Sequence, residues 1–361
     1  MISFHAASET LKPNRMRWNP LPLDADNKDF VEGLVTYCGA GTPEMKSGLA
    51  VHMYTCSRSM QRRAFCNSDG EMLIVPQEGT LLLKTELGLL RVPPGHICVI
   101  PRGVRFLVQL TEEGKAVRGY ICEIFQSSFI LPDLGPIGSN GLANPRDFET
   151  PVAWYEIEDA EWQLVQKFGG SLFEAALDHS PFDVVAWHGN YVPYRYDLAR
   201  FCAINSVTFD HLDPCTFVVL TAPSGEPGVA VCDFVIFPPR YMVQEHTFRP
   251  PYFHRNCMSE FMGNIRGVYE AKLEGFLPGG ATLHSIMAAH GPDAECTEAA
   301  MEAELVPVKS DPNALAFMFE STFLLRMTKF ALESGLVQEN YTDCWQGLQR
   351  HFVPPAEEQD S

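Results

Sequence analysis

Short apolar runs separated by turn-forming residues dominate the first half of the chain. Between residues 49 and 125, strand-length runs such as 72–75 and 96–100 alternate with turn-forming segments such as Asn67-Ser68-Asp69-Gly70 and Pro93-Pro94-Gly95. Runs of this length bounded by Gly, Pro, Asn and Asp are typical of β-hairpins. The pattern therefore predicts a meander of antiparallel strands in this half.

A similar pattern returns after residue 200. Strand-like runs occupy residues 206–209, 216–221 and 229–237, and the last of them is followed by Pro238-Pro239. Proline cannot continue a sheet ladder, so it marks the end of that strand. The second half therefore predicts a second β region.

Helical spacing of apolar residues is convincing only near the C-terminus. It predicts one helix that begins at Ser321 as the N-cap and ends at Gly335. Residues 1–30, in contrast, are polar, contain proline and show no periodicity, which predicts a loosely attached arm.

One turn in the first half has a more specific spacing. Gly95-x5-Pro101-x-Gly103 has the turn residues of the second cupin motif, which reverse the chain between two jelly-roll strands. Metal-binding cupins place a histidine three residues after the last glycine, where this chain has Phe106. This half is therefore predicted to be a cupin fold without a metal.

These patterns together predict a mainly β, cupin-like protein of the jelly-roll or β-sandwich type, with two domains and few helices. The 361 residues, 46% of them apolar, are enough for two packed domains. We expect an N-terminal cupin-like β domain over residues 1–198 and a C-terminal catalytic β domain over residues 199–361.

Composition excludes some function classes. A net charge of −18 disfavours binding to nucleic acid or to an anionic membrane. The 11 cysteines are scattered without a C-x-x-C pair, which indicates reduced thiols and a cytoplasmic protein. No apolar stretch is long enough to span a bilayer, and the first residues lack the apolar segment of a secretion signal, so the chain is expected to be neither membrane-spanning nor secreted.

Candidate metal ligands gather in the second half. Residues 251–260 are predicted to form a strand, which would place His254 and Glu260 on one face. His254-x-Asn256-x3-Glu260-x6-Gly267 matches the first cupin motif, except that asparagine replaces the second histidine. A third ligand is expected after a Pro/Gly turn, and either His284 or His290 could supply it.

Two histidines and one carboxylate form the facial triad of non-haem iron(II) oxygenases, which leaves coordination positions open for substrate and dioxygen. A closed zinc site needs a fourth protein ligand. Cys257 would face away from His254 on a strand, which argues against structural zinc. Three alternatives stay open: a zinc or manganese cupin isomerase or hydrolase, an inactive structural protein, or histidines that are only hydrogen-bonded in the core.

Arginines near these candidate ligands make an anionic substrate plausible in an otherwise acidic chain. They are Arg240, Arg249, Arg255 and Arg266. The alternative is that they pair with surface acids such as Glu245, Glu270 and Glu274.

The run Phe248-Arg249-Pro250-Pro251-Tyr252-Phe253-His254-Arg255-Asn256-Cys257-Met258-Ser259-Glu260-Phe261-Met262-Gly263 resembles the homogentisate 1,2-dioxygenase family almost residue for residue, as does Gly275-Phe276-Leu277-Pro278-Gly279-Gly280. The resemblance covers nearly the whole chain after Trp18. Family members carry a further segment before the region matching Met16-Arg17-Trp18, so this chain is expected to be an N-terminally shortened form.

The resemblance implies a set of site residues. The Fe(II) ligands would be His254, Glu260 and His290, with His290 also touching substrate. Tyr269 would contact the substrate and His284 would line its pocket. The catalytic base would be His211, in the segment Asp210-His211-Leu212-Asp213-Pro214.

The implied reaction is ring cleavage of homogentisate by dioxygen to maleylacetoacetate, in tyrosine and phenylalanine catabolism, without an organic cofactor. The implied assembly is a trimer, or a hexamer built from two trimers.

Overall fold

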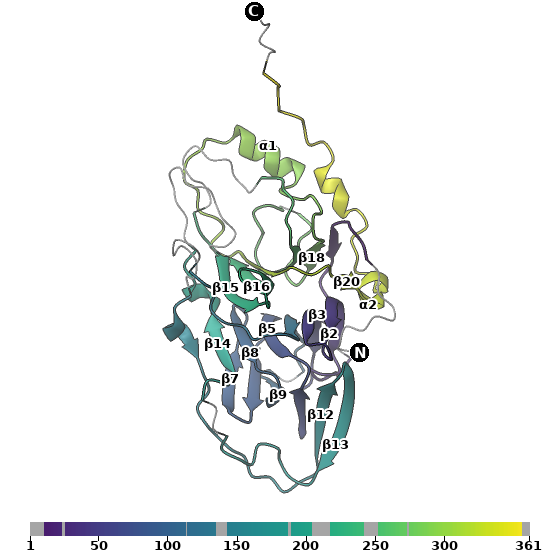
Figure 1. Cartoon of the computed structure of the whole chain (residues 1–361), viewed down its shortest axis with the longest axis vertical. Helices are drawn as coiled ribbons and strands as arrows, with labels where there is room; N and C mark the ends of the chain where they lie inside the picture. Colours follow the sequence, from purple (N-terminus) through teal and green to yellow (C-terminus); the bar gives the residue numbers. More distant parts are fainter. Residues whose placement is uncertain are drawn as a thin grey trace, which may run out of the picture.

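The fold is a stack of three β-sheets, seen in a computed structural model (Figure 1). The residues that it describes are 11–23, 26–112, 114–134, 143–186, 189–203, 217–241, 252–272 and 274–355. Two α-helices lie in these ranges, α1 (Ala294–Glu302) and α2 (Lys329–Glu333). The prediction of a mainly β protein with few helices is confirmed.

The central sheet has eight strands, each next to its neighbours in the order given: β11 (Phe148–Glu149), β14 (Tyr194–Asp197), β8 (His96–Ile100), β5 (Glu71–Glu78), β10 (Val117–Ile124), β3 (Ser47–Cys56), β2 (Leu34–Thr42) and β20 (Arg326–Met327). A second sheet has six, again in order: β13 (Ser171–Leu177), β12 (Trp162–Phe168), β4 (Arg63–Asn67), β9 (Arg105–Leu110), β6 (Leu81–Thr85) and β7 (Gly88–Val92).

Strands β3 to β10 form a jelly roll. Four of these consecutive strands lie side by side in the order β3-β10-β5-β8, and the other four face them in the order β4-β9-β6-β7. This division of eight strands into two four-stranded sheets is the jelly-roll arrangement that cupins use. Phe106 is fully buried inside it at 5.6 Å from Phe65, so the position where metal-binding cupins carry a histidine is part of an apolar core.

The third sheet carries the candidate site. Its six strands, in order, are β1 (Met16–Trp18), β18 (Ala281–His284), β17 (Ser259–Arg266), β19 (Leu315–Ser321), β16 (Ala230–Phe237) and β15 (Val218–Pro223). Neighbouring strands run antiparallel throughout.

The central sheet is buried on both faces, which explains its continuous apolar runs. On β5, Leu73 and Val75 belong to the core shared with the third sheet, whereas Met72 and Ile74 belong to the jelly-roll core. Side chains alternate between the two faces of a strand, so a run that is apolar at every position serves two cores. At Gly263 on β17 an added Cβ would lie 2.3 Å from Phe317 on the neighbouring strand β19 and 3.0 Å from Tyr120 of the central sheet, so there is no room for a side chain between the two sheets there.

The two predicted domains are tied together by strands from each end of the described chain. Strand β1 pairs with β18 in the third sheet, and β20 pairs with β2 in the central sheet. The boundary near residue 198 therefore stays a prediction. No helix within the described ranges is long and apolar enough to cross a membrane.

The prediction of a loosely attached N-terminal arm is wrong for the described part of that segment. Trp18 is 1% exposed, its indole nitrogen donates to the carbonyl of Ala331 at 2.7 Å, and its ring packs edge-on against Tyr37. Burial of this one side chain anchors β1 to the body of the protein.

The predicted helix at residues 321–335 is also largely wrong. Ser321 is the last residue of β19, and α2 begins only after Thr328, whose hydroxyl caps it by accepting from the nitrogen of Ala331. Between them only Arg326 and Met327 form a strand, β20, in which Met327 pairs with Cys38. Tertiary pairing thus overrides the helical spacing.

A buried charged cluster lies in the N-terminal half. The ammonium group of Lys167 contacts the carboxylates of Glu123 and Asp69, and His52 lies 3.0 Å from the same Glu123 carboxylate. Asn67 donates to Glu123 as well, at 2.8 Å. Each charge is therefore paired and hydrogen-bonded, as a buried ion requires.

This cluster predicts a pH dependence of stability. Burial alone would raise the pKa of Glu123, but the charge of Lys167 and the hydrogen bond from His52 outweigh it and lower the pKa from 4.5 to about 2. Because the folded pKa is depressed, this stabilisation is complete above about pH 4.5 and is lost as the pH falls toward 2. Urea unfolding at pH 6 and pH 3 should show a smaller loss for Glu123→Gln than for the unmodified chain; an equal loss would contradict the assignment.

Candidate metal centre

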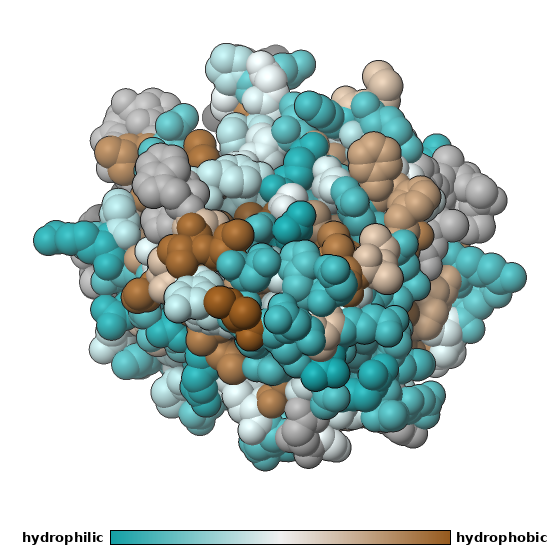
Figure 2. Space-filling view, turned by 90° about the horizontal axis from the view of Figure 1, so that it is seen from below, coloured by the Kyte–Doolittle hydropathy of each residue, from teal (hydrophilic) through white to brown (hydrophobic). Residues whose placement is uncertain are grey.

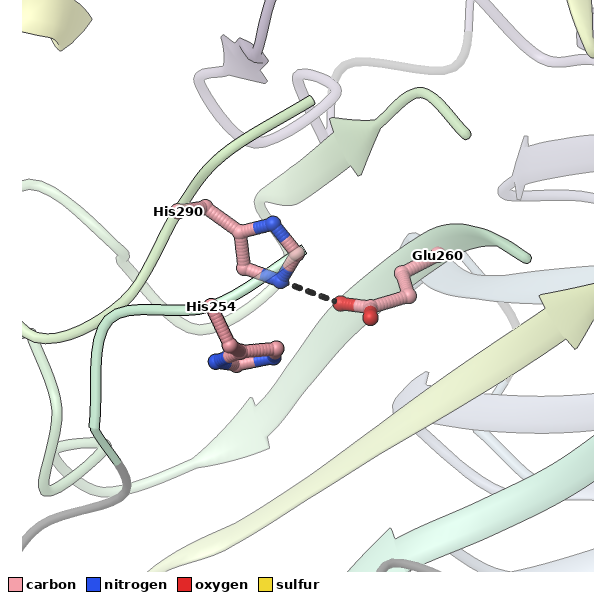
Figure 3. Close-up of side chains that lie close together, drawn as sticks. All are labelled: His254, Glu260 and His290. Carbon is pink, nitrogen blue, oxygen red and sulfur yellow. Dashed lines mark ion pairs between the residues drawn. The ribbon is translucent and has the colours of Figure 1, made fainter. Parts of the chain in front are cut away.

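Three side chains converge at one end of β17. One ligand atom from each of His254, Glu260 and His290 lies within 4.8 Å of the other two (Figure 3). Glu260 stands on β17, whereas the histidines come from two loops that are joined by a pair of backbone hydrogen bonds, from His254 N to His290 O at 2.7 Å and from His290 N to His254 O at 2.9 Å. Residues distant in sequence are thus fixed beside one carboxylate.

The predicted strand over residues 251–260 is wrong in the residues that the structure describes. Strand β17 begins only at Ser259, and His254 makes an isolated bridge with His290. The two candidate ligands still meet, because this bridge replaces the strand in holding His254. Cys257 is exposed and lies outside the group of three.

Both histidines have the tautomer of a metal ligand. The Nδ1 atom of His254 lies 2.7 Å from the carbonyl of Tyr252, and that of His290 lies 2.8 Å from the carbonyl of Ala288. A carbonyl oxygen only accepts, so each Nδ1 carries a proton, and Nε2 is the ring nitrogen that is left to bind a metal. Histidine ligands in metalloproteins are oriented by the same kind of contact.

The group of three has the geometry of a cation site. His290 Nε2 is buried and lies 2.9 Å from Glu260 Oε2, the ion pair that Figure 3 marks with a dashed line. A lone pair and a carboxylate oxygen repel each other at this distance unless a proton or a metal ion lies between them. Burial would raise the pKa of Glu260, but His284 and His290 lower it well below its ordinary range. The donor set therefore fits a divalent metal.

Asn256 occupies the place of the second histidine of the cupin motif. Its amide donates to Glu260 Oε1 at 2.8 Å and also to the carboxylate of Glu320 on β19, and its oxygen accepts from the nitrogen of Met258 at 2.9 Å. Burial raises the pKa of Glu320 to about 7. Asn256 thus orients the carboxylate ligand and adds no ligand atom to the group of three.

His284 lies beside the group of three on β18, directly across from Glu260. Its ring stacks on His290 with centroids 4.1 Å apart, and its two nitrogens face Glu260 and the hydroxyl of Tyr341. Burial lowers the pKa of His284 to about 4. Both polar atoms of this side chain are therefore engaged within the protein.

The loop of His290 is held by residues that the sequence did not single out. Arg15 donates to the carbonyl of Ala289 at 2.9 Å, while Lys272 and the indole of Trp345 donate to the carbonyl of Gly291. Arg15 and Lys272 each lie 4.3 Å from the centre of the Trp345 ring. Hydrogen bonds thus fix the carbonyls on both sides of His290, and cation–π contacts with Trp345 hold the donors of these bonds in place.

Comparison with known proteins places this site in a family. The family description "Homogentisate 1,2-dioxygenase N-terminal" matches residues 1–198, and "Homogentisate 1,2-dioxygenase C-terminal" matches residues 199–352. The chain belongs to the homogentisate 1,2-dioxygenase family. The resemblance noted in the sequence is confirmed.

Relatives in this family are close. The homogentisate 1,2-dioxygenase of Dictyostelium discoideum is 60% identical over 338 residues, 93% of this chain and 77% of that protein. That of Drosophila melanogaster is 57% identical over 345 residues, 94% of this chain and 78% of that protein. Among solved structures, protein Ylba from E. coli is 11% identical with a TM-score of 0.36, over 87% of this chain and 94% of that one.

Membership of a dioxygenase family does not favour the alternative functions. The match to homogentisate 1,2-dioxygenases supports a ring-cleaving oxidoreductase over a zinc or manganese isomerase or hydrolase and over an inactive structural protein.

Of two further expected site residues, Tyr269 lies in the described part of the chain and His211 does not. Tyr269 is partly buried at 5.5 Å from Phe237 and 6.0 Å from Phe276, ring centre to ring centre, on the loop that follows β17. His211 lies outside the described residues.

The expectation that arginines near the site serve an anionic substrate is not met by Arg240. This side chain is 7% exposed and forms an ion pair with Glu270 beneath the rings of Phe217 and Phe237. The alternative of pairing with Glu270 is correct for this residue, but the pair is buried and not on the surface as expected.

Proposed function

We propose that this chain is an iron(II)-dependent dioxygenase that cleaves the ring of homogentisate with dioxygen, giving maleylacetoacetate in tyrosine and phenylalanine catabolism. The observation that carries the proposal is the convergence of His254, Glu260 and His290, with His290 Nε2 at 2.9 Å from Glu260 Oε2, in a chain of this family. Both of these atoms can bind one divalent metal ion.

His254, Glu260 and His290 would hold the iron. Three protein ligands leave positions open, and bound iron(II) would supply the one-electron chemistry that dioxygen needs. Glu260 is kept anionic and is oriented by Asn256, and both histidine rings are oriented by carbonyl groups. These contacts favour ligand exchange at the open positions over movement of the protein ligands.

Tyr269 would bind the substrate as a hydrogen-bond donor. Burial, together with the negative charges of Glu270 and Glu260, raises the pKa of Tyr269, so its phenol stays protonated at neutral pH. A protonated phenol donates to a carboxylate or a phenolate oxygen. His290 would contact the substrate from the metal side. His211 would take or hold a phenolic proton of the substrate.

The setting of this activity is part of the proposal. We assign the protein to the cytoplasm, since all ten cysteines in the described ranges are free thiols. We propose that it forms a homo-oligomer, either a trimer or a hexamer. We also propose that it binds neither nucleic acid nor membranes. Figure 2 shows apolar groups among hydrophilic ones on the lower face of the molecule. Phe168, Leu172 and Phe173 of β12 and β13 are exposed, and exposed apolar patches are typical of interfaces.

The test is dioxygen uptake by the iron(II)-loaded chain with homogentisate, followed together with the absorbance of maleylacetoacetate. Uptake and product in equal amounts are the expected result. Iron binding without uptake would refute the proposed reaction, and failure to bind iron would refute the metal centre.

His211→Ala should separate proton transfer from metal binding. Removal of a general base costs about 10² to 10⁴ in rate, whereas the metal ligands are untouched. Iron content should match that of the unmodified chain while turnover falls by this factor. A variant that loses iron, or that keeps full turnover, would contradict the assigned role.

A further inference from the structure

Tyr341 connects a distant segment of the chain to the metal centre. It opens the short 3-10 helix η5 (Tyr341–Trp345), is 2% exposed, and places its hydroxyl 2.8 Å from Nε2 of His284. Its ring lies nearly parallel to that of His284, at 17°, and the guanidinium group of Arg17 lies over the Tyr341 ring, 4.3 Å from its centre. Both the hydroxyl and the ring are therefore fixed.

Hydrogen-bond chemistry sets the direction of these contacts. Nδ1 of His284 faces Glu260 Oε2 at 3.4 Å, and an ionised carboxylate only accepts. Nδ1 therefore carries the ring proton, which leaves a lone pair on Nε2. The Tyr341 hydroxyl must then donate to Nε2, and this donation selects the one tautomer of His284 that can donate to Glu260.

His284 contacts two of the three candidate ligands at once. It stands across from Glu260 in the register of β17 and β18, and its ring stacks on His290 at 24° with centroids 4.1 Å apart. A rotation of this ring would disturb both neighbours. With both nitrogens engaged and 4% of its surface exposed, His284 is better suited to orienting the ligands than to binding substrate.

We propose that Tyr341 is a positioning residue of the metal centre, which acts through His284 on Glu260 and His290. The proposal rests on the metal centre of the proposed function and does not depend on the substrate. Residues that orient a metal ligand typically contribute 10- to 100-fold in metal affinity. The same factor is the effect expected here.

The test compares Tyr341→Phe with Tyr120→Phe in the full chain. Tyr120 is a matched control, because it is equally buried and its hydroxyl donates to the carbonyl of Gly280 at 2.8 Å, away from the candidate ligands. Cobalt(II) affinity by calorimetry and the visible spectrum of the cobalt site are measured beside urea unfolding of the metal-free chains.

Both variants should lose unfolding free energy, since each gives up one buried hydrogen bond. Only Tyr341→Phe should weaken cobalt binding, by about 10- to 100-fold, and alter the cobalt spectrum. In a His284→Leu background, Tyr341→Phe should have no further effect on affinity.

Equal cobalt affinity in Tyr341→Phe and the unmodified chain would overturn the positioning role alone. A full effect of Tyr341→Phe in the His284→Leu background would also overturn it, because the hydroxyl would then act by another route. Failure of the unmodified chain to bind cobalt would overturn the metal centre and this role together. Cobalt binding, combined with no homogentisate turnover by the iron(II)-loaded chain, would overturn only the proposed reaction.

Discussion

Glu260→Gln is expected to reduce bound iron to the background level and to abolish dioxygen uptake. The amide lacks the charge that balances a divalent cation, and its NH₂ group can donate to the Nε2 lone pair of His290, which satisfies that atom without a metal. His254→Ala should have the same outcome because it removes one of only two nitrogen donors. Metal analysis after anaerobic purification measures the effect.

Asp233→Asn is the matched control for this substitution. Asp233 is a neighbouring carboxylate of the same sheet, on β16, and it is not in the group of three. This variant should keep its iron. Unchanged iron in both Glu260→Gln and His254→Ala would remove the basis for the site.

Lys167→Met is expected to destabilise the protein by about 3–5 kcal/mol, because it leaves the buried carboxylates of Glu123 and Asp69 without their cation. Equilibrium unfolding in urea measures the loss. Lys329→Met is the control, since Lys329 pairs with Glu333 on the surface at 3.6 Å, and such exposed pairs contribute about 0–1 kcal/mol.

A paired variant keeps this prediction testable if Lys167→Met does not fold. Lys167→Met combined with Glu123→Gln removes one orphaned charge and should recover part of the lost stability. A loss below 1 kcal/mol for Lys167→Met alone would show that the cluster is hydrated or rearranges.

The positions of several strands were predictable because turn-forming residues bound each apolar run. Their pairing was not, because among β3 to β10 only β6 and β7 are neighbours both in sequence and in a sheet, so the predicted meander is wrong. The run predicted at residues 96–100 is β8, His96–Ile100, and that at 229–237 is β16, Ala230–Phe237, within one residue. The pattern of apolar residues does not show which element packs against each buried face. The predicted helix failed for this reason, because Leu324 and Phe330 are 55% and 38% exposed and no single helical face is buried.

The candidate ligands were predictable only in part. The spacing of His254 and Glu260 identified the site, but it left His284 and His290 open as the third ligand, and the structure brings together His254, Glu260 and His290. Tyr341, Trp345 and Arg15 carry no motif, and they reach the site through long-range packing. A buried tyrosine far from any motif has no signal in a single sequence, and only the fold places it beside a histidine.

Strands β1 and β20 each pair with a strand that is far away in the sequence, and this affects how the chain folds during synthesis. Strand β1 is synthesised long before its partner β18, and β2 long before its partner β20. The early strands must remain unpaired at one edge while the rest is translated, and closing such long loops slows folding. Exposed edges are sites of association, so a chaperone that shields β1 and β2 during synthesis should raise the yield of soluble protein more than one added after release.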